Sequence, residues 1–319
     1  MKPKILFMGT PDFAVPALQK LLDDGYPVVG VVCQPDRPQG RHMKLQAPPV
    51  KQLAVQHHIP VLQPEKVRTP DFETAIRALG PEMIVTAAYG RLLPANILAI
   101  PPMGCLNIHA SLLPAYRGAA PIQWCLIRGE HQTGVTIMLM NEGMDTGDII
   151  IQRSILIAED IDAGQLSEIL SALGAEMLPE AINGLLTGKL KPQPQDNALA
   201  STISTMNRET GRVNWQVPAL EIHNLIRGTS PWPGAFTWCG SRRIKIHKAR
   251  VCSDPAIIAA GVGQAPGVIC SCGSEAISVA CGEGVLDLLE IQSDSGKRLH
   301  CRDCGHNFRS GQLMGGESQ

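Results

Sequence analysis

Three polar side chains, Asn107, His109 and Asp145, have the types and spacing that could carry out chemistry. Asn107 and His109 stand two residues apart at the end of an apolar run, and Asp145 lies in a glycine-flanked loop, residues 141–148. On an extended strand, residues two apart project from the same face, so an amide and an imidazole can converge on one oxygen atom. A carboxylate from a neighbouring strand end would orient the imidazole.

This combination suits acyl transfer to an amine. The tetrahedral intermediate of that reaction carries negative charge on the former carbonyl oxygen, and Asn107 and a protonated His109 can both donate hydrogen bonds to it. Asp145 would hold the imidazolium and relay a proton from the attacking amine through a water molecule. An unprotonated α-amine, with a reference pKa of about 7.7 to 8.0, is a competent nucleophile, so no Ser or Cys intermediate is required.

Each of these residues also has an ordinary structural interpretation. An Asn-x-His sequence at a strand end can be a structural polar pair. An Asp in a glycine-rich turn often only forms the turn, because Asp tolerates the left-handed conformation and caps helices. The active-site hypothesis therefore requires a fold that brings the three side chains together.

The first 190 residues alternate short β-branched runs with helical patterns, which predicts the elements that would position the site. Such an order is typical of βαβ units in a doubly wound, mostly parallel α/β sheet, where ligands bind at the carboxyl ends of the strands. Strands are predicted at residues 4–8, 28–33, 61–62, 83–87, 105–108 and 135–140. Helices are predicted near residues 13–22, 48–57, 71–79, 121–128 and 163–186.

A second, smaller domain is predicted after a Pro-rich linker. Residues 1–189 form the predicted catalytic domain, residues 190–207 the linker, residues 208–313 the second domain and residues 314–319 a disordered tail. In the second domain, a helical segment at 218–227 precedes five short strands, which predict a small OB-like β-barrel. The strands are expected at residues 235–238, 244–249, 267–270, 276–281 and 285–291.

Several other classes of protein are disfavoured. A single Gly9 precedes Pro11 in the first turn, and neither G-x-G-x-x-G nor G-x-x-x-x-G-K-[ST] follows the first strand, which argues against a dehydrogenase or an NTPase. The formal charge of −1 requires any nucleic-acid contact to come from local basic patches. The sequence shows neither a signal peptide nor an apolar stretch of about 20 residues, so we expect a soluble, cytoplasmic protein whose cysteines remain thiols.

Longer motifs resemble the folate-dependent formyltransferase family, and the similarity extends over nearly the whole chain. The most specific are NIHASLLP at 107–114, RGAAPIQ at 117–123, GVT at 134–136 and DTGD at 145–148. Further similarity lies in MGTPDFAVPAL at 8–18, QPDRPQGR at 34–41, AYGRLLP at 88–94 and SPWPGA at 230–235.

The resemblance implies transfer of a formyl group from 10-formyltetrahydrofolate to the amino group of methionyl initiator tRNA, for translation initiation. We expect the protein to be a monomer. Asn107, His109 and Asp145 would be the catalytic residues. A loop with Arg37 and Arg41 would enter the acceptor arm of the tRNA. Residues of two segments would bind the folate: Tyr89, Gly90, Ser111, Leu112, Leu113 and Pro114.

Basic residues of the second domain are further candidates for tRNA contacts. The segment 202–208 has one basic residue where the family has a lysine-rich stretch, which leaves the contribution of the linker open. Arg242, Arg243 and Lys245 lie on one predicted strand pair and are better candidates, although an ordinary solvated barrel face would look the same.

Other interpretations are weaker. Cys270, Cys272, Cys301 and Cys304 could form a zinc site, but the first pair has C-x-C spacing and cysteine packs well as a small apolar residue, so we expect no metal. The acceptor could instead be a small amine, such as a glycinamide nucleotide or an amino sugar, or the chain could be a non-catalytic RNA-binding protein. The PDFAVP sequence and the second domain argue against the small amine. The presence of all three polar candidates argues against loss of catalysis.

Overall fold

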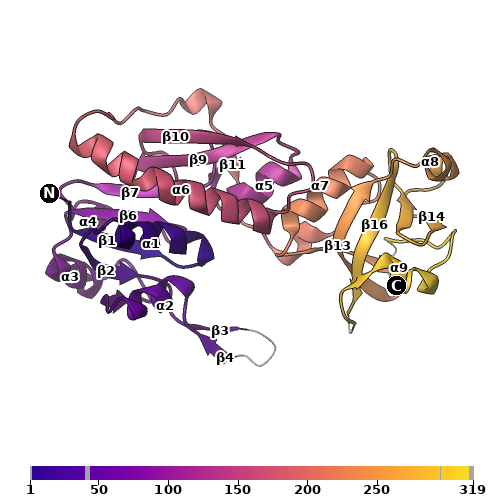
Figure 1. Cartoon of the computed structure of the whole chain (residues 1–319), viewed down its shortest axis with the longest axis horizontal. Helices are drawn as coiled ribbons and strands as arrows, with labels where there is room; N and C mark the ends of the chain where they lie inside the picture. Colours follow the sequence, from indigo (N-terminus) through magenta and orange to yellow (C-terminus); the bar gives the residue numbers. More distant parts are fainter. Residues whose placement is uncertain (1, 40–43, 295, 316–319) are drawn as a thin grey trace. The chain divides into compact units, whose positions relative to one another are not determined.

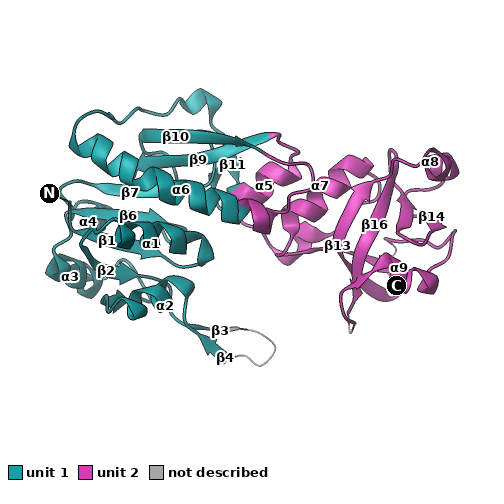
Figure 2. Ribbon diagram, in the orientation of Figure 1, with its two compact units in different colours: residues 1–121, 132–156, 167–203 teal, residues 122–131, 157–166, 204–319 magenta. Residues whose placement is uncertain are grey.

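The computed structural model describes residues 2–39, 44–294 and 296–315 (Figure 1). The chain forms two compact units (Figure 2). Unit 1 comprises residues 1–121, 132–156 and 167–203, and unit 2 comprises residues 122–131, 157–166 and 204–319. Two short segments that precede residue 190 therefore belong to unit 2, which a linear domain boundary drawn from composition does not show.

Unit 1 is built on a seven-stranded sheet of order β10-β9-β7-β6-β1-β2-β5. Five strands are parallel: β1 (Ile5–Gly9), β2 (Val28–Val32), β5 (Val61–Leu62), β6 (Met83–Ala87) and β7 (Cys105–His109). Two antiparallel strands extend the sheet beyond β7: β9 (Gln132–Leu139) and β10 (Ile149–Leu156). The predicted mostly parallel α/β sheet is confirmed.

Helices accompany the strands close to where the apolar periodicity predicts them. They are α1 (Val15–Asp23), α2 (Pro49–Gln56), α3 (Pro70–Leu79), α4 (Ala95–Leu98), α5 (Pro121–Ile127) and α6 (Ala163–Leu186). Local signals set their ends. In α3, the Thr69 side chain accepts a hydrogen bond from the Phe72 N–H, and Gly80 ends the helix at φ 58°.

Helix α6 packs against the sheet through a glycine. A Cβ atom at Gly174 would lie 2.6 Å from Cγ2 of Ile108, so only glycine allows this close approach to β7. By length and composition alone α6 could cross a membrane, but half of its most apolar window is buried inside the protein. Burial of that kind is typical of a core helix that covers a sheet (Figure 1).

Two small strand pairs extend unit 1. A hairpin of β3 (Arg37–Gln39) and β4 (Lys44–Gln46) follows β2, where a loop was predicted. Strand β8 (Arg117–Gly118) pairs in parallel with β11 (Thr202–Ile203). Part of the polar segment predicted as linker is therefore bound to unit 1.

Unit 2 carries helix α7 (Ala219–Thr229) and an antiparallel sheet of order β12-β13-β16-β15-β14, with β17 paired to β16. All five predicted strands are present: β12 (Ala235–Cys239), β13 (Arg242–Val251), β14 (Ile269–Cys272), β15 (Ile277–Ala280) and β16 (Val285–Ser293). The short elements α8 (Pro255–Gly261), β17 (Leu299–His300) and α9 (Cys301–Cys304) lack a periodic pattern and were not predicted.

The C-terminal segment joins the two ends of this sheet. The Gly315 N–H donates to the Trp238 carbonyl in β12 (2.8 Å), and the Met314 N–H donates to the Gly267 carbonyl ahead of β14 (2.7 Å). These bonds close the strand path as in a small barrel. The prediction of a disordered tail from residue 314 is wrong for Met314, which is 1% exposed in the core of unit 2. Burial of this apolar side chain stabilises the folded unit, which the polar composition of the tail did not indicate. Residues 316–319 lie outside the described residues.

Candidate active site

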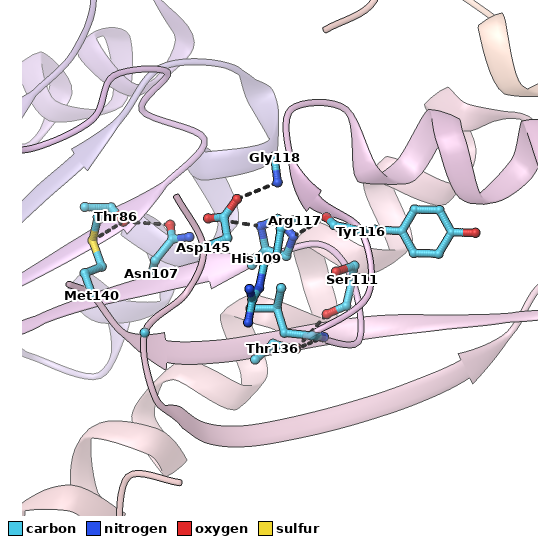
Figure 3. Close-up of polar contacts among 12 residues, drawn as sticks. Thr86, Asn107, His109, Ser111, Tyr116, Arg117, Gly118, Thr136, Met140 and Asp145 are labelled. Carbon is cyan, nitrogen blue, oxygen red and sulfur yellow. Dashed lines mark hydrogen bonds and ion pairs between the residues drawn. The ribbon is translucent and has the colours of Figure 1, made fainter. Parts of the chain in front are cut away.

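Asn107 is held in one orientation on β7. It lies beside Thr86 of β6 and Met138 of β9 in the sheet register. The hydroxyl of Thr86, itself 3% exposed, donates to Oδ1 of Asn107 at 2.7 Å. The amide NH2 group therefore points away from Thr86, toward the side where His109 and Asp145 lie (Figure 3). This leaves a hydrogen-bond donor aimed into the site.

His109, the last residue of β7, is 6% exposed and faces an acceptor at each ring nitrogen. Its Nε2 lies 3.0 Å from the carbonyl oxygen of Tyr116, and its Nδ1 lies 3.6 Å from Oδ1 of Asp145. The Tyr116 carbonyl can only accept a hydrogen bond, so Nε2 is its donor, whereas the 3.6 Å separation from Asp145 is an ion-pair distance and not a hydrogen bond, which leaves Nδ1 available to a substrate atom. The Tyr116 contact fixes the ring so that Nδ1 faces the site.

Asp145 belongs to the loop between β9 and β10. Its backbone is left-handed, with φ 52°, a conformation that aspartate adopts more readily than most residues other than glycine. Its Oδ2 accepts a hydrogen bond from the Gly118 N–H at 2.8 Å, which leaves Oδ1 directed at His109 (Figure 3). The structure thus brings together the three residues that the sequence singled out.

The predicted folate segment 111–114 is largely engaged within the protein. Ser111 is 1% exposed, and its hydroxyl donates to the Ala115 carbonyl at 2.7 Å. The Leu113 N–H donates to Thr136 Oγ1, and the side chain of Leu113 is 3% exposed. Leu112 and Pro114 are half-buried, so they are the members of this segment that present surface to a ligand.

The predicted folate residues Tyr89 and Gly90 form a fixed turn after β6. The Tyr89 carbonyl accepts hydrogen bonds from Thr10 Oγ1 (3.3 Å) and Gln34 Nε2 (3.1 Å), and Gly90 adopts φ 83°. Tyr89 is 4% exposed, its buried hydroxyl has no hydrogen-bond partner among the described residues, and burial raises the pKa of that hydroxyl to about 12. This turn therefore offers a ligand its backbone rather than the phenol.

Two cavities flank this turn. One, of about 680 Å³, is lined by Tyr89, Gly90 and Arg37 together with residues of the β1–α1 turn and of α2. The other, of about 500 Å³, is lined by Leu92, Leu93 and neighbouring residues and by Glu142 of the Asp145 loop. Leu92 and Leu93 lie within the AYGRLLP motif, so that motif could have identified them as candidates.

The predicted tRNA-contacting residues differ in their availability. Arg37, Arg242 and Lys245 are exposed, whereas Arg41 lies outside the described residues. The guanidinium carbon of Arg243 lies 3.9 Å from the Phe236 ring centroid, and the buried Arg243 Nε has no hydrogen-bond partner in the part of the chain that the structure describes. Arg243 is therefore partly a packing residue, which its sequence position did not reveal.

The cysteines behave as apolar side chains. All ten are free thiols, and burial raises the pKa of Cys301 to about 12. Within the described residues, no group of three or more His, Cys, Asp or Glu side chains is arranged to hold a metal ion.

Comparisons with known proteins identify the family. The family described as formyl transferase matches residues 1–182, and its C-terminal domain matches residues 205–309. The chain is 45% identical over 316 residues to a methionyl-tRNA formyltransferase of Ruminiclostridium cellulolyticum, covering 98% of this chain and 99% of the relative. It is 48% identical over 313 residues to that of Trichlorobacter lovleyi, covering 98% and 96%.

A solved structure shows the shared fold. The N-formyltransferase of Helicobacter canadensis, in complex with folinic acid and dTDP-3-aminofucose, matches with a TM-score of 0.64 at 19% identity, covering 90% of this chain and 99% of that one. With relatives of 45% and 48% identity over nearly its full length, the chain belongs to the formyl transferase family and, within it, to the methionyl-tRNA formyltransferases.

Proposed function

We propose that this chain transfers the formyl group of 10-formyltetrahydrofolate to the amino group of methionyl initiator tRNA by direct attack of the amine. One observation carries the mechanism: Asn107, His109 and Asp145 converge at the carboxyl edge of the sheet. The family and the relatives named methionyl-tRNA formyltransferase support the reaction and its acceptor.

The chemistry needs no covalent enzyme intermediate. The amine attacks the formyl carbon, and negative charge develops on the formyl oxygen, which the Asn107 NH2 group and the His109 imidazolium stabilise by donating hydrogen bonds. Asp145 accepts the proton that the amine loses, through a water molecule. When the intermediate collapses, the bond to N10 of the folate breaks, N10 takes up through water the proton that Asp145 accepted, and tetrahydrofolate leaves with Asp145 again ionised.

We assign the folate donor to the residues predicted from the sequence. Tyr89 and Gly90 contribute the backbone of their turn, and Leu112 and Pro114 contribute half-buried surface. Ser111 and Leu113 contribute by fixing the conformation of their loop, since the Ser111 hydroxyl and the Leu113 N–H are already hydrogen-bonded within the protein. The monomeric state and the cytoplasmic location stay predictions.

The segment that carries Arg37 and Arg41 is proposed to contact the acceptor arm of the tRNA. Asp36, which precedes this segment, is anchored, because Lys51 Nζ donates to Asp36 Oδ2 at 2.8 Å and Gln63 Nε2 donates to Asp36 Oδ1 at 2.7 Å. Arg41→Ala is expected to lower kcat/KM for methionyl-tRNA by at least about 10-fold while folate binding stays unchanged. Initial rates at varied tRNA concentration would measure this.

The control for that prediction is Arg77→Ala, which removes an exposed arginine of α3 paired with Glu73. It should formylate methionyl-tRNA at the wild-type rate. Unchanged formylation by the Arg41 variant would mean that the segment that carries Arg37 and Arg41 does not contribute to acceptor binding.

Exposed basic residues of β13 are proposed to contact phosphates. Replacing Arg242 and Lys245 together by alanine should weaken tRNA binding and reduce the slope of log Kd against log salt by about 1 to 2, because each phosphate contact releases counterions. The matched control, Arg77→Ala with Arg153→Ala, removes two exposed charges from unit 1 and should leave the slope intact. If the slope of log Kd against log salt is the same for the wild type and the β13 variant, these residues of β13 do not contact the tRNA.

A further inference from the structure

We propose that Gln195 is a positioning residue that holds the Asp145 loop in its reactive conformation; this inference rests on the proposed role of Asp145. Gln195 lies in the Pro-rich segment that composition marks as a linker. In the structure its side chain is half-buried and reaches the loop that carries Asp145.

The Gln195 amide donates two hydrogen bonds to the Asp145 loop and accepts two from Arg117. Its Nε2 donates to the carbonyl oxygens of Asp145 (2.9 Å) and Gly147 (2.7 Å). Its Oε1 accepts from Nε (3.0 Å) and Nη2 (2.8 Å) of Arg117. One side chain thus joins the backbone of the catalytic loop to a guanidinium.

The chemistry of these neighbours determines which way the amide faces. Arg117 can only donate hydrogen bonds and the two loop carbonyls can only accept them, so the reversed amide would oppose donor to donor and acceptor to acceptor. Glutamine is the side chain of this length that offers a donor at one corner and an acceptor at the other. Glutamate in its place would keep the Arg117 contact and set an oxygen against the two carbonyls.

Arg117 is itself fixed, which makes it a firm anchor. It is 8% exposed, and its Nη2 donates to Asn197 Oδ1 at 2.8 Å as well as to Gln195. Its backbone N–H donates to the Ser201 carbonyl at 2.8 Å where β8 pairs with β11. The 195–203 segment is therefore bound to the strand that approaches the site.

The same segment also supports the carbonyl that orients His109. Tyr116 has a left-handed backbone, with φ 62°, and its N–H donates to Ser201 Oγ at 2.9 Å. Asp145 is left-handed as well, with φ 52°. Such conformations persist only where the surroundings hold them, and here both are held by contacts from one segment.

The structure assigns Gln195 an effect on the chemical step rather than on substrate binding. Gln195→Glu should lower kcat by about 10- to 100-fold, because a loop displaced by a fraction of an ångström misdirects the Asp145 carboxylate. KM for tRNA and for folate should stay within about threefold, and the melting temperature should stay near that of the wild type because the Arg117 contact remains. Steady-state kinetics and thermal unfolding measure these quantities.

The matched control is Gln193→Glu, which makes the same change of charge two residues away. Gln193 is exposed and pairs with Ile149 through its backbone, which the substitution leaves in place. Wild-type kcat for the Gln193 variant and reduced kcat for the Gln195 variant would show that the position matters and not the added charge. Equal loss in both variants would overturn the proposal.

A double-mutant cycle with Asp145→Asn separates positioning from a general structural role. If Gln195 acts through Asp145, Gln195→Glu should change kcat by less than about threefold in the Asp145→Asn background. A full further loss in that background would overturn the proposal. If Asp145→Asn is severe and Gln195→Glu is silent, this inference alone is overturned. If Asp145→Asn is silent, the proposed role of Asp145 in the mechanism is overturned with it.

Discussion

Replacing Asn107 or His109 by alanine is expected to lower kcat by about 10²- to 10³-fold, because each substitution removes one donor to the developing oxyanion. The donors act mainly on the transition state, so affinity for the folate donor should change little. The Asn107 donor is already oriented in the structure, since Thr86 occupies the oxygen end of its amide. Single-turnover formylation and equilibrium binding of the folate would measure the two quantities.

The control is His131→Ala, which removes an exposed imidazole from unit 2 and should retain wild-type kcat. A near-normal kcat for the Asn107 or His109 variant would refute the oxyanion assignment for that residue. A parallel loss of folate binding would point to a role in the ground state instead.

Asp145→Asn is expected to reduce kcat by about 10²-fold or more, although the side chain keeps its size. The amide oxygen of asparagine can still accept the hydrogen bond from the Gly118 N–H. The negative charge that faces Nδ1 of His109 at 3.6 Å is lost, and with it the acceptor for the proton of the amine. The measurement is kcat at saturating folate and methionyl-tRNA.

Asp196→Asn provides a matched control for that change. Asp196 is exposed and caps a short 3-10 helix, a task that asparagine performs as well. The control should keep full activity. Comparable activity of the Asp145 and Asp196 variants would show that the charge of Asp145 is not needed for the reaction.

Much of the α/β unit could be predicted because its elements have strong periodic signals. Helix α6 begins and ends where the apolar pattern predicts, and β7 carries Asn107 and His109 on one face as their spacing requires. Strand β10 was missed because it is an exposed edge strand that lacks a regular alternation of apolar and polar residues. Edge strands are stabilised by their single neighbour, which a local pattern does not show.

The support of the site could not be predicted, because it depends on contacts between residues far apart in the chain. Gln195 lies 50 residues after Asp145, in a segment whose prolines and polar residues are typical of a linker. Its role follows from side-chain hydrogen bonds to the Asp145 loop and to Arg117, which only the folded chain brings within reach. Likewise, Arg243 resembles its basic neighbours in sequence, and only the fold shows that it stacks on Phe236.

The most direct test is a formylation assay with labelled 10-formyltetrahydrofolate and two acceptors, methionyl initiator tRNA and methionyl elongator tRNA. We predict rapid formylation of the initiator and a kcat/KM for the elongator that is lower by at least about 10-fold. The label should remain on the α-amino group of methionine after the ester bond is hydrolysed. Failure to formylate initiator methionyl-tRNA, together with transfer to a small amine such as an amino sugar, would contradict the proposed function.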